Sequence, residues 1–110
     1  MLRSDLWVAA FVRRHNDLGH ICVVARKGDP AAGQVFIEID HLDGTVSLFA
    51  PAPASSEDRL DDRTFVPRFT RASPQLVQER VSREAQFDPD FWLIGLEMRG
   101  DDAGLPLARR

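Results

Sequence analysis

The sequence predicts an α+β fold: an antiparallel sheet of four or five strands packed with two helices, in the order α-β-β-β-(β)-α-β. Two segments, 4–18 and 73–86, combine the apolar spacing of amphipathic helices with residues that start and stop helices. Between and after them lie short β-branched segments bounded by Gly, Asp and Pro, which are typical of antiparallel strands. Because 110 residues is a usual size for one domain, we expect 1–110 to fold as a single α+β domain.

The first helix is predicted over 4–18. Ser4 is a good N-cap, and Gly19 suits the left-handed position that follows many helices. Spacings of three and four residues place one set of side chains on a stripe that should face the core. The stripe consists of Trp7, Ala10, Phe11, Arg14 and Leu18.

The next three segments are predicted to form a three-stranded antiparallel meander. If Asp43 and Gly44 make a two-residue turn, counting outward places Ile39 opposite Leu48. The same counting across GDPAAG pairs the first two segments, and both turns then agree on one apolar face. That face holds Ile21, Val23, Ile37, Ile39, Leu48 and Ala50. The opposite face is mixed and holds Cys22, Val24, Arg26, Phe36, Glu38, Asp40, Ser47 and Phe49.

The second half of the chain contains a loop, an edge strand, a helix, a strand and a tail. Residues 51–63 carry prolines and an acidic cluster without apolar periodicity, and we expect a mobile loop there. Pro67 confines the following strand to an edge. Ser73 should cap the second helix, which buries Leu76, Val77, Val81 and Ala85. The last strand has Trp92, Ile94, Leu96 and Met98 on one face, and residues 100–110 should fray.

Composition excludes several classes of protein. With 44% hydrophobic and 28% charged residues the chain is expected to fold, and a net charge of −3 argues against nucleic acid as the main partner. The single cysteine, Cys22, rules out an intramolecular disulfide and fits a reducing compartment. The apolar run at 6–12 is too short for a signal peptide or a membrane span, so we expect a cytoplasmic protein without membrane contact.

No motif of known catalytic chemistry is found. There is no nucleophile elbow, no Gly-rich loop leading into a helix, and no metal-ligand spacing among His15, His20 and His41, so we expect no cofactor and no metal. The segment 63–71 interleaves arginines with phenylalanines, a pattern of single-stranded nucleic acid binders. The acidic cluster beside it favours intramolecular ion pairs instead.

The stretch FDPDFW is the most distinctive in the chain. Asp88 and Asp90 flank Pro89 between the second helix and the last strand. Two carboxylates could support acid/base chemistry, but this spacing is more typical of an Asx turn that ends a helix. We expect Phe87, Phe91 and Trp92 to anchor this corner to the core, whereas an exposed Trp there would mark a binding patch.

Three motifs together resemble one family. They are DLWVAAFVRR at 5–14, RKGDPAAG at 26–33 and FDPDFW at 87–92. In order and spacing they are similar to the domain of unknown function family 1491, small proteins of alphaproteobacteria. The resemblance implies a shared fold, and it brings no activity, substrate or cofactor with it.

These observations leave two main functional hypotheses. The first is a non-catalytic cytoplasmic module that binds an unknown protein partner or forms a homo-oligomer. Its candidate surface is the mixed sheet face around Phe36, Glu38 and Phe49, or the corner around Trp92. The alternative is a small ligand-binding protein or enzyme with a polar pocket between the end of the first helix and the FDPD corner. The residues of that pocket would be Arg13, Arg14, Asp88 and Asp90.

Overall fold

The computed structural model describes residues 2–53, 63–101 and 103–107. Its element order confirms the predicted α+β class, with two helices and five strands. The elements are α1 (Ser4–Asp17), β1 (Ile21–Arg26), β2 (Val35–Asp40), β3 (Val46–Pro51), β4 (Phe65–Ala72), α2 (Pro74–Phe87) and β5 (Trp92–Glu97).

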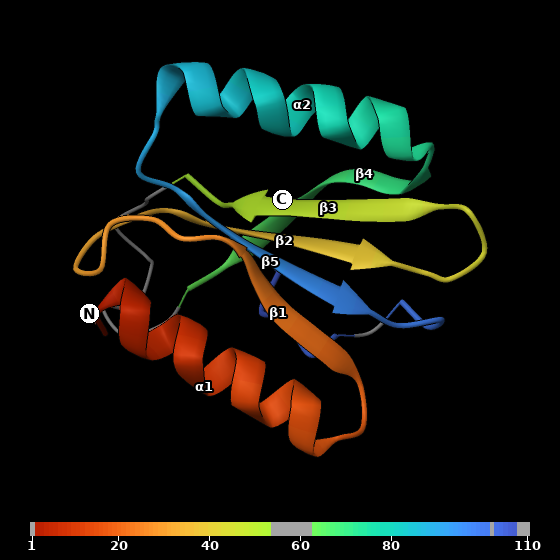
Figure 1. Ribbon diagram of the computed structural model, residues 1–110, viewed down its shortest axis with the longest axis horizontal. Coiled ribbons are helices and arrows are strands. Elements are labelled where there is room, and N and C mark those ends of the chain that lie inside the picture. The colour runs from red at the N-terminus through yellow and green to blue at the C-terminus, as the bar shows by residue number, and fades with distance from the viewer. Residues whose placement is uncertain (1, 54–62, 102, 108–110) are drawn as a thin grey trace.

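The sheet order is β1-β5-β2-β3-β4, so the last strand lies between the first two (Figure 1). The predicted hairpin between β1 and β2 is therefore wrong. β5 pairs antiparallel with β1 and parallel with β2. Among the strands of the described residues, β2–β5 is the one parallel pair. The GDPAAG loop does not fold β2 back onto β1, because it bonds to the residues that lead into β5: the Asp29 amide donates to the Asp90 carbonyl at 2.9 Å.

The β2–β3 register differs from the predicted one by a single residue. Glu38 lies opposite Leu48, where the two-residue turn predicted Ile39. Since side chains alternate between faces, this slip moves Leu48 and Ala50 to the face opposite Ile39. The residues predicted to share one apolar face therefore lie on both faces of the sheet, with Ile37 and Ile39 on one and Leu48 and Ala50 on the other.

The connecting turn explains the slip. It is longer than two residues, and it closes with the His41 amide donating to the Thr45 carbonyl at 3.1 Å. Leu42 and Gly44 both have positive φ, 62° and 88°. The Asp40 carboxylate accepts the Leu42 N–H at 2.9 Å, which holds Leu42 in this unusual conformation.

The two helices lie on opposite faces of the sheet, α1 below and α2 above in Figure 1. α1 packs on β1 and β5, and α2 packs on β3 and β4. The predicted faces of β5 are confirmed, since Trp92, Ile94, Leu96 and Met98 belong to the α1-side core, while Leu93 belongs to the other. The α1-side core consists of Val8, Phe11, Cys22, Val35, Ile37, Ile39, Phe65, Trp92, Ile94, Leu96, Met98 and Ala103. The α2-side core consists of Phe36, Val46, Leu48, Ala50, Val77, Phe91 and Leu93.

α1 buries a different stripe from the predicted one. Ser4, Val8, Phe11 and His15 are buried, whereas Leu18 is 66% exposed. Ser4 does not cap the helix, because its hydroxyl donates instead to the Gly33 carbonyl at 2.6 Å. The N-cap position belongs to Arg3, which makes no side-chain cap bond. Gly19 has φ +93°, as predicted for the residue that ends this helix.

α2 follows its prediction more closely. The Ser73 hydroxyl accepts the Leu76 N–H at 3.4 Å, and Pro74 occupies the first turn. Val77 is buried, with Val81 and Ala85 partly buried beside it. Leu76 was expected in the core but is 50% exposed, because it lies one position off the stripe that faces β3 and β4.

Residues 100–110 were predicted to fray, but 103–107 pack against the rest of the fold. Ala103 lies in the α1-side core, and the Pro106 carbonyl accepts the Phe65 N–H at 2.9 Å. Leu107 forms an isolated parallel bridge with Phe65. Of the predicted mobile loop, Pro51 is the last residue of β3, and residues 54–62 lie outside the described part of the chain.

Candidate functional site

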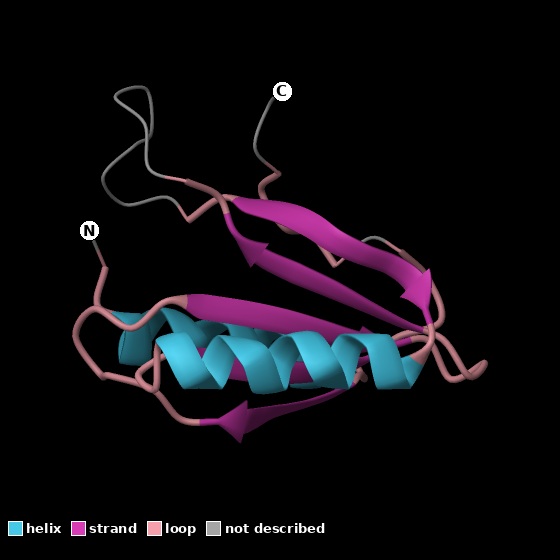
Figure 2. Cartoon of the chain, turned by 90° about the horizontal axis from the view of Figure 1, so that it is seen from above, coloured by secondary structure: helices cyan, strands magenta, loops and turns pink. Residues whose placement is uncertain are grey.

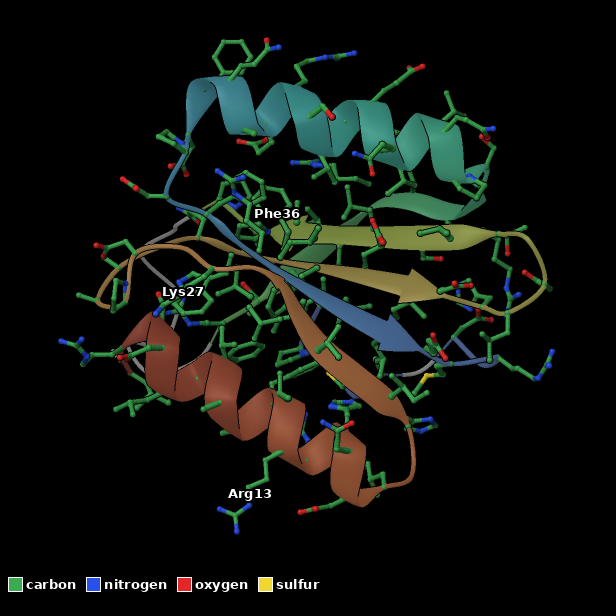
Figure 3. The ribbon with its side chains drawn as sticks, in the orientation of Figure 1. Arg13, Lys27 and Phe36 are labelled. Atoms are coloured by element: carbon green, nitrogen blue, oxygen red, sulfur yellow. The ribbon has the colours of Figure 1, made fainter. Side chains whose placement is uncertain are left out.

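The residues of the predicted mixed face are not on one face. Phe36 is buried in the α2-side core and points toward α2 (Figure 3). Glu38 is on the same side and half-buried, and burial, followed by the nearby Asp40 carboxylate, raises its pKa. Phe49 lies opposite Ile37 and packs against the α1-side core. The structure therefore brings Phe36 and Glu38 together and separates both from Phe49.

The predicted polar pocket is not assembled either. The FDPD corner lies beside the start of α1, whereas Arg13 and Arg14 are in its last turns and Arg13 projects into solvent (Figure 3). Arg13 lies nine positions after Ser4 in the helix, about 13.5 Å along the axis. A hollow beside Arg13 and Arg14 and another beside Asp88 share no lining residue.

The FDPDFW stretch has a structural role. The Asp88 carboxylate accepts the Asp90 N–H at 3.0 Å, which is the expected Asx turn. Phe91 and Trp92 are buried, and the Trp92 indole N–H donates to the Asp29 carbonyl at 2.8 Å. Phe87 is the exception among the predicted anchors, being 81% exposed. Because Trp92 is buried and hydrogen-bonded, it does not form an exposed binding patch.

The RKGDPAAG loop folds around this corner at very short range. A Cβ on Gly28 would lie 2.3 Å from the Asp90 carbonyl oxygen, and one on Gly33 would lie 2.5 Å from the same atom. The Asp29 carboxylate accepts the amides of Ala31 and Ala32 and so shapes the loop. Only glycine permits this backbone approach.

Arg26 and the start of α1 complete the junction. The Arg26 guanidinium donates to the Pro89 carbonyl at 2.9 Å and lies over the Phe91 ring. The Asp5 amide donates to the Pro30 carbonyl at 2.9 Å. The three motifs that carry the family resemblance therefore meet at one place, where polar groups from each of them hold the chain segments together.

One arginine of segment 63–71, Arg71, has carboxylate partners among the described residues. Arg71 donates to the carboxylates of Asp101 and Asp43 at 2.9 and 3.0 Å, and to the Arg99 carbonyl at 2.6 Å. The acidic cluster predicted to pair with these arginines lies outside the described residues, and Arg71 pairs with Asp43 and Asp101 instead.

The two buried imidazoles are likewise bonded within the fold, and the single thiol is buried. His15 bonds the carbonyls of Phe11 and Ala103, and His41 bonds the Met98 carbonyl and the Ser47 hydroxyl. Burial raises the pKa of the Cys22 thiol to about 11, which disfavours the reactive thiolate. The described residues contain no cluster of three or more potential metal ligands. In the same part of the chain, no helix is long and apolar enough to cross a bilayer.

The feature that sequence reasoning missed is an exposed apolar edge at β1. Cys22 packs toward α1, so Ile21 and Val23 point to the other side of the sheet, where α2 packs over β3 and β4. Ile21 is 59% and Val23 52% exposed. Figure 2 shows β1 along the lower margin of the sheet, beyond α2. We call Ile21 and Val23, with Glu38, Gly95 and Glu97 beside them in the register, the open face.

The two edges of the sheet differ. β4 carries Pro67, which lacks an N–H, two register shifts against β3 and the exposed Arg68, all of which obstruct the addition of another strand. β1 has one register shift, near Ala25, and neither a proline nor a charged residue before Arg26. The meander prediction concealed this, because it placed β1 beside β2 without showing which of its faces would remain uncovered.

The geometry defines a small mixed α+β domain whose motif residues stabilise a structural junction and whose β1 edge is apolar and open. The chain belongs to the family described as "Protein of unknown function (DUF1491)", whose model matches residues 2–105. This confirms the family resemblance of the three motifs. None of the curated proteins matches the chain.

Solved structures agree with this assignment. The solution structure of protein Atu0922 from A. tumefaciens is 31% identical, with a TM-score of 0.85 over 99% of this chain and 96% of that one. The crystal structure of a DUF1491 family protein from Caulobacter crescentus CB15 is 32% identical, with a TM-score of 0.78 over 98% of each chain. The NMR structure of a DUF1491 family protein from the same organism is 31% identical, with a TM-score of 0.78 over 98% of this chain and 97% of that one.

Proposed function

We propose that the protein is a non-catalytic interaction module that self-associates through the β1 edge. The observation that carries the proposal is the contrast between the two edges of the sheet. β4 carries features that obstruct strand addition, whereas β1 presents exposed Ile21, Val23 and Val24 along an edge that no other strand covers and where the Asn16 side chain bonds the backbone of Cys22. An apolar edge of this kind is normally covered in the functional state.

A second copy of the chain is the occupant that fits this edge. Two β1 strands related by a twofold axis would pair antiparallel and join the two sheets, the simplest closed arrangement for identical subunits. Residues 21–25 of β1 are uncharged, so no like charges would lie opposite one another. Six residues span about 20 Å, which is long enough for a ladder of hydrogen bonds. Pairing there would displace the Asn16 amide, which bonds both backbone groups of Cys22.

The interface would be modest. A single added strand buries less than the ~1,600 Å² of a standard interface, so we expect a weak dimer that dissociates on dilution. We place the module in the cytoplasm, which is consistent with the free, buried Cys22 thiol.

Sedimentation equilibrium of the wild type and two variants tests the proposal. Val23→Lys puts a charge on the open face and should weaken dimerisation at least about tenfold. Leu76→Lys is the matched control, since Leu76 is 50% exposed on α2 and Val23 52% exposed on β1. The control should dimerise like the wild type. A protein that stays monomeric up to about 1 mM would refute the proposal, as would equal effects of the two substitutions.

A further inference from the structure

A hollow of about 260 Å³ lies between α1 and the segment 103–107, away from the open face of the sheet. Trp7 and Phe11 line it with their rings, which stack at a centroid distance of 5.2 Å and an interplanar angle of 18°. The remaining lining residues are Ala10, Arg14, Arg63, Gly104 and Pro106. Three separate segments thus form an aromatic surface bordered by two arginines.

The two guanidinium groups lie near the rings. The Arg14 Cζ is 5.7 Å from the Phe11 ring centroid, and the Arg63 Cζ is 6.0 Å from the Trp7 centroid. Among the described residues, neither arginine has a carboxylate within ion-pair distance. The hollow is therefore lined by two cationic groups without a local counter-charge from the described chain.

Arg63 is held in position by the fold. It donates to the Leu2 carbonyl at 3.1 Å and to the Ser4 hydroxyl at 3.0 Å. Its Nε is buried and has no acceptor among the described residues. Burial also lowers the pKa of the Arg63 guanidinium. A partly desolvated cation with an unused donor gains free energy from an anionic acceptor.

We propose that this hollow binds a small anion, a carboxylate or phosphate carried on a flat apolar group. The planar fork of an arginine matches the oxygens of either anion, and the partly exposed Trp7 ring, packed on the buried Phe11, suits a ring or another flat body. The volume lies just below the range of about 300–1,000 Å³ found for drug-sized ligands, which limits the occupant to a single-ring molecule. The site is independent of pairing at β1.

Amide NMR titration with four probes tests the inference. Benzoate and phenyl phosphate carry both the anion and the ring, inorganic phosphate lacks the ring, and benzyl alcohol lacks the charge. Trp7 and Trp92 are the two tryptophans of the chain, so their indole N–H signals report separately on the hollow and on the corner junction. We expect benzoate or phenyl phosphate to shift the Trp7 signal saturably below about 10 mM and to leave Trp92 unmoved.

Adjacent arginines supply the variant and its control. Arg14→Gln should weaken binding about tenfold, the effect of losing one charge-assisted hydrogen bond. Arg13→Gln removes the same charge one residue away, outside the lining of this hollow, and should bind like the wild type. Both arginines are exposed, and the Trp92 signal checks that each variant is folded.

Four results would overturn the inference. One is the absence of a saturable Trp7 shift with either ring-bearing anion. A second is an equal loss of affinity in Arg13→Gln and Arg14→Gln, which would indicate a general charge effect. A third is benzyl alcohol binding as tightly as phenyl phosphate, because the charge would then contribute nothing. The fourth is inorganic phosphate binding as tightly as phenyl phosphate, because the ring would then contribute nothing.

Discussion

Gly28 offers the sharpest test of the corner junction. Its replacement by Ala would place a Cβ 2.3 Å from the Asp90 carbonyl oxygen and 2.6 Å from the Phe91 carbonyl carbon. Both are backbone atoms, so no rotation of a side chain can relieve the overlap. The φ of Gly28 lies outside the left-handed range, and the expected strain is therefore steric alone.

The size of the effect follows from the contacts that must move. Forcing a methyl group into a packed site costs about 1–3 kcal/mol. Moving the chain before β5 also breaks the Asp29–Asp90 and Arg26–Pro89 hydrogen bonds, each worth about 0.5–1.5 kcal/mol. The free energy of unfolding should therefore fall by roughly 2–6 kcal/mol, and the melting temperature by at least about 8 °C.

Urea unfolding followed by far-ultraviolet circular dichroism measures this difference. Gly100→Ala is the matched control, because no atom of the described residues, its two chain neighbours apart, lies within 4 Å of the added Cβ. Its stability should stay within about 0.5 kcal/mol of wild type. If Gly28→Ala unfolds at the same urea concentration as Gly100→Ala, the proposed role of the corner junction is wrong.

Three further predictions concern single side chains. Ser73→Ala removes the cap of α2 and should lower the free energy of unfolding by about 1 kcal/mol in urea titrations; an unchanged midpoint would contradict the role of the cap. Because burial raises the pKa of Cys22 to about 11, its thiol should react with a disulfide reagent at pH 8 at least about 100-fold more slowly in the folded than in the urea-unfolded protein, and equal rates would contradict this. Burial, and then the Asp40 carboxylate, raises the pKa of Glu38 in the folded protein. The contribution of Glu38 to the free energy of unfolding is therefore fully present below its ordinary pKa of 4.5 and is lost as the pH rises through the raised pKa of the folded state. Glu38→Gln should therefore gain stability relative to wild type at pH 7 compared with pH 4, and an identical difference at both pH values would refute the assignment.

Local chemistry in the sequence predicted the ends and types of the elements well. Gly19 ends α1, Ser73 and Pro74 begin α2, and Pro67 lies on an edge strand, because each depends on backbone preferences of nearby residues. The alternation in β5 also predicted its two faces.

Long-range pairing was beyond the same reasoning. GDPAAG has the composition of a hairpin turn, but its glycines serve a close approach to residues about 60 positions later in the chain. The Asp43–Gly44 pair predicted a two-residue turn, yet the Asp40 carboxylate stabilises Leu42 at positive φ and lengthens it.

The candidate sites depended on those missed pairings. The residues of the hollow come from α1, the chain before β4 and segment 103–107, the last of which was expected to fray. Arg14 was among the residues predicted to bind a ligand, but its companion in the hollow is Arg63 rather than Asp88 or Asp90. No spacing in the sequence brings Arg14 and Arg63 together, because they meet only once the tertiary structure has formed.

The place of β5 between β1 and β2 has a consequence for how the protein is made. Ribosomes release β1 and β2 well before β5, yet those two strands touch β5 and not each other. The strand that pairs with both β1 and β2 is therefore missing until residues 92–97 emerge. During most of synthesis β1 has no strand to pair with. We expect a fragment that ends at residue 91 to bind a synthetic peptide of residues 92–107. Neither part alone should form the native sheet, and mixing the two should restore it.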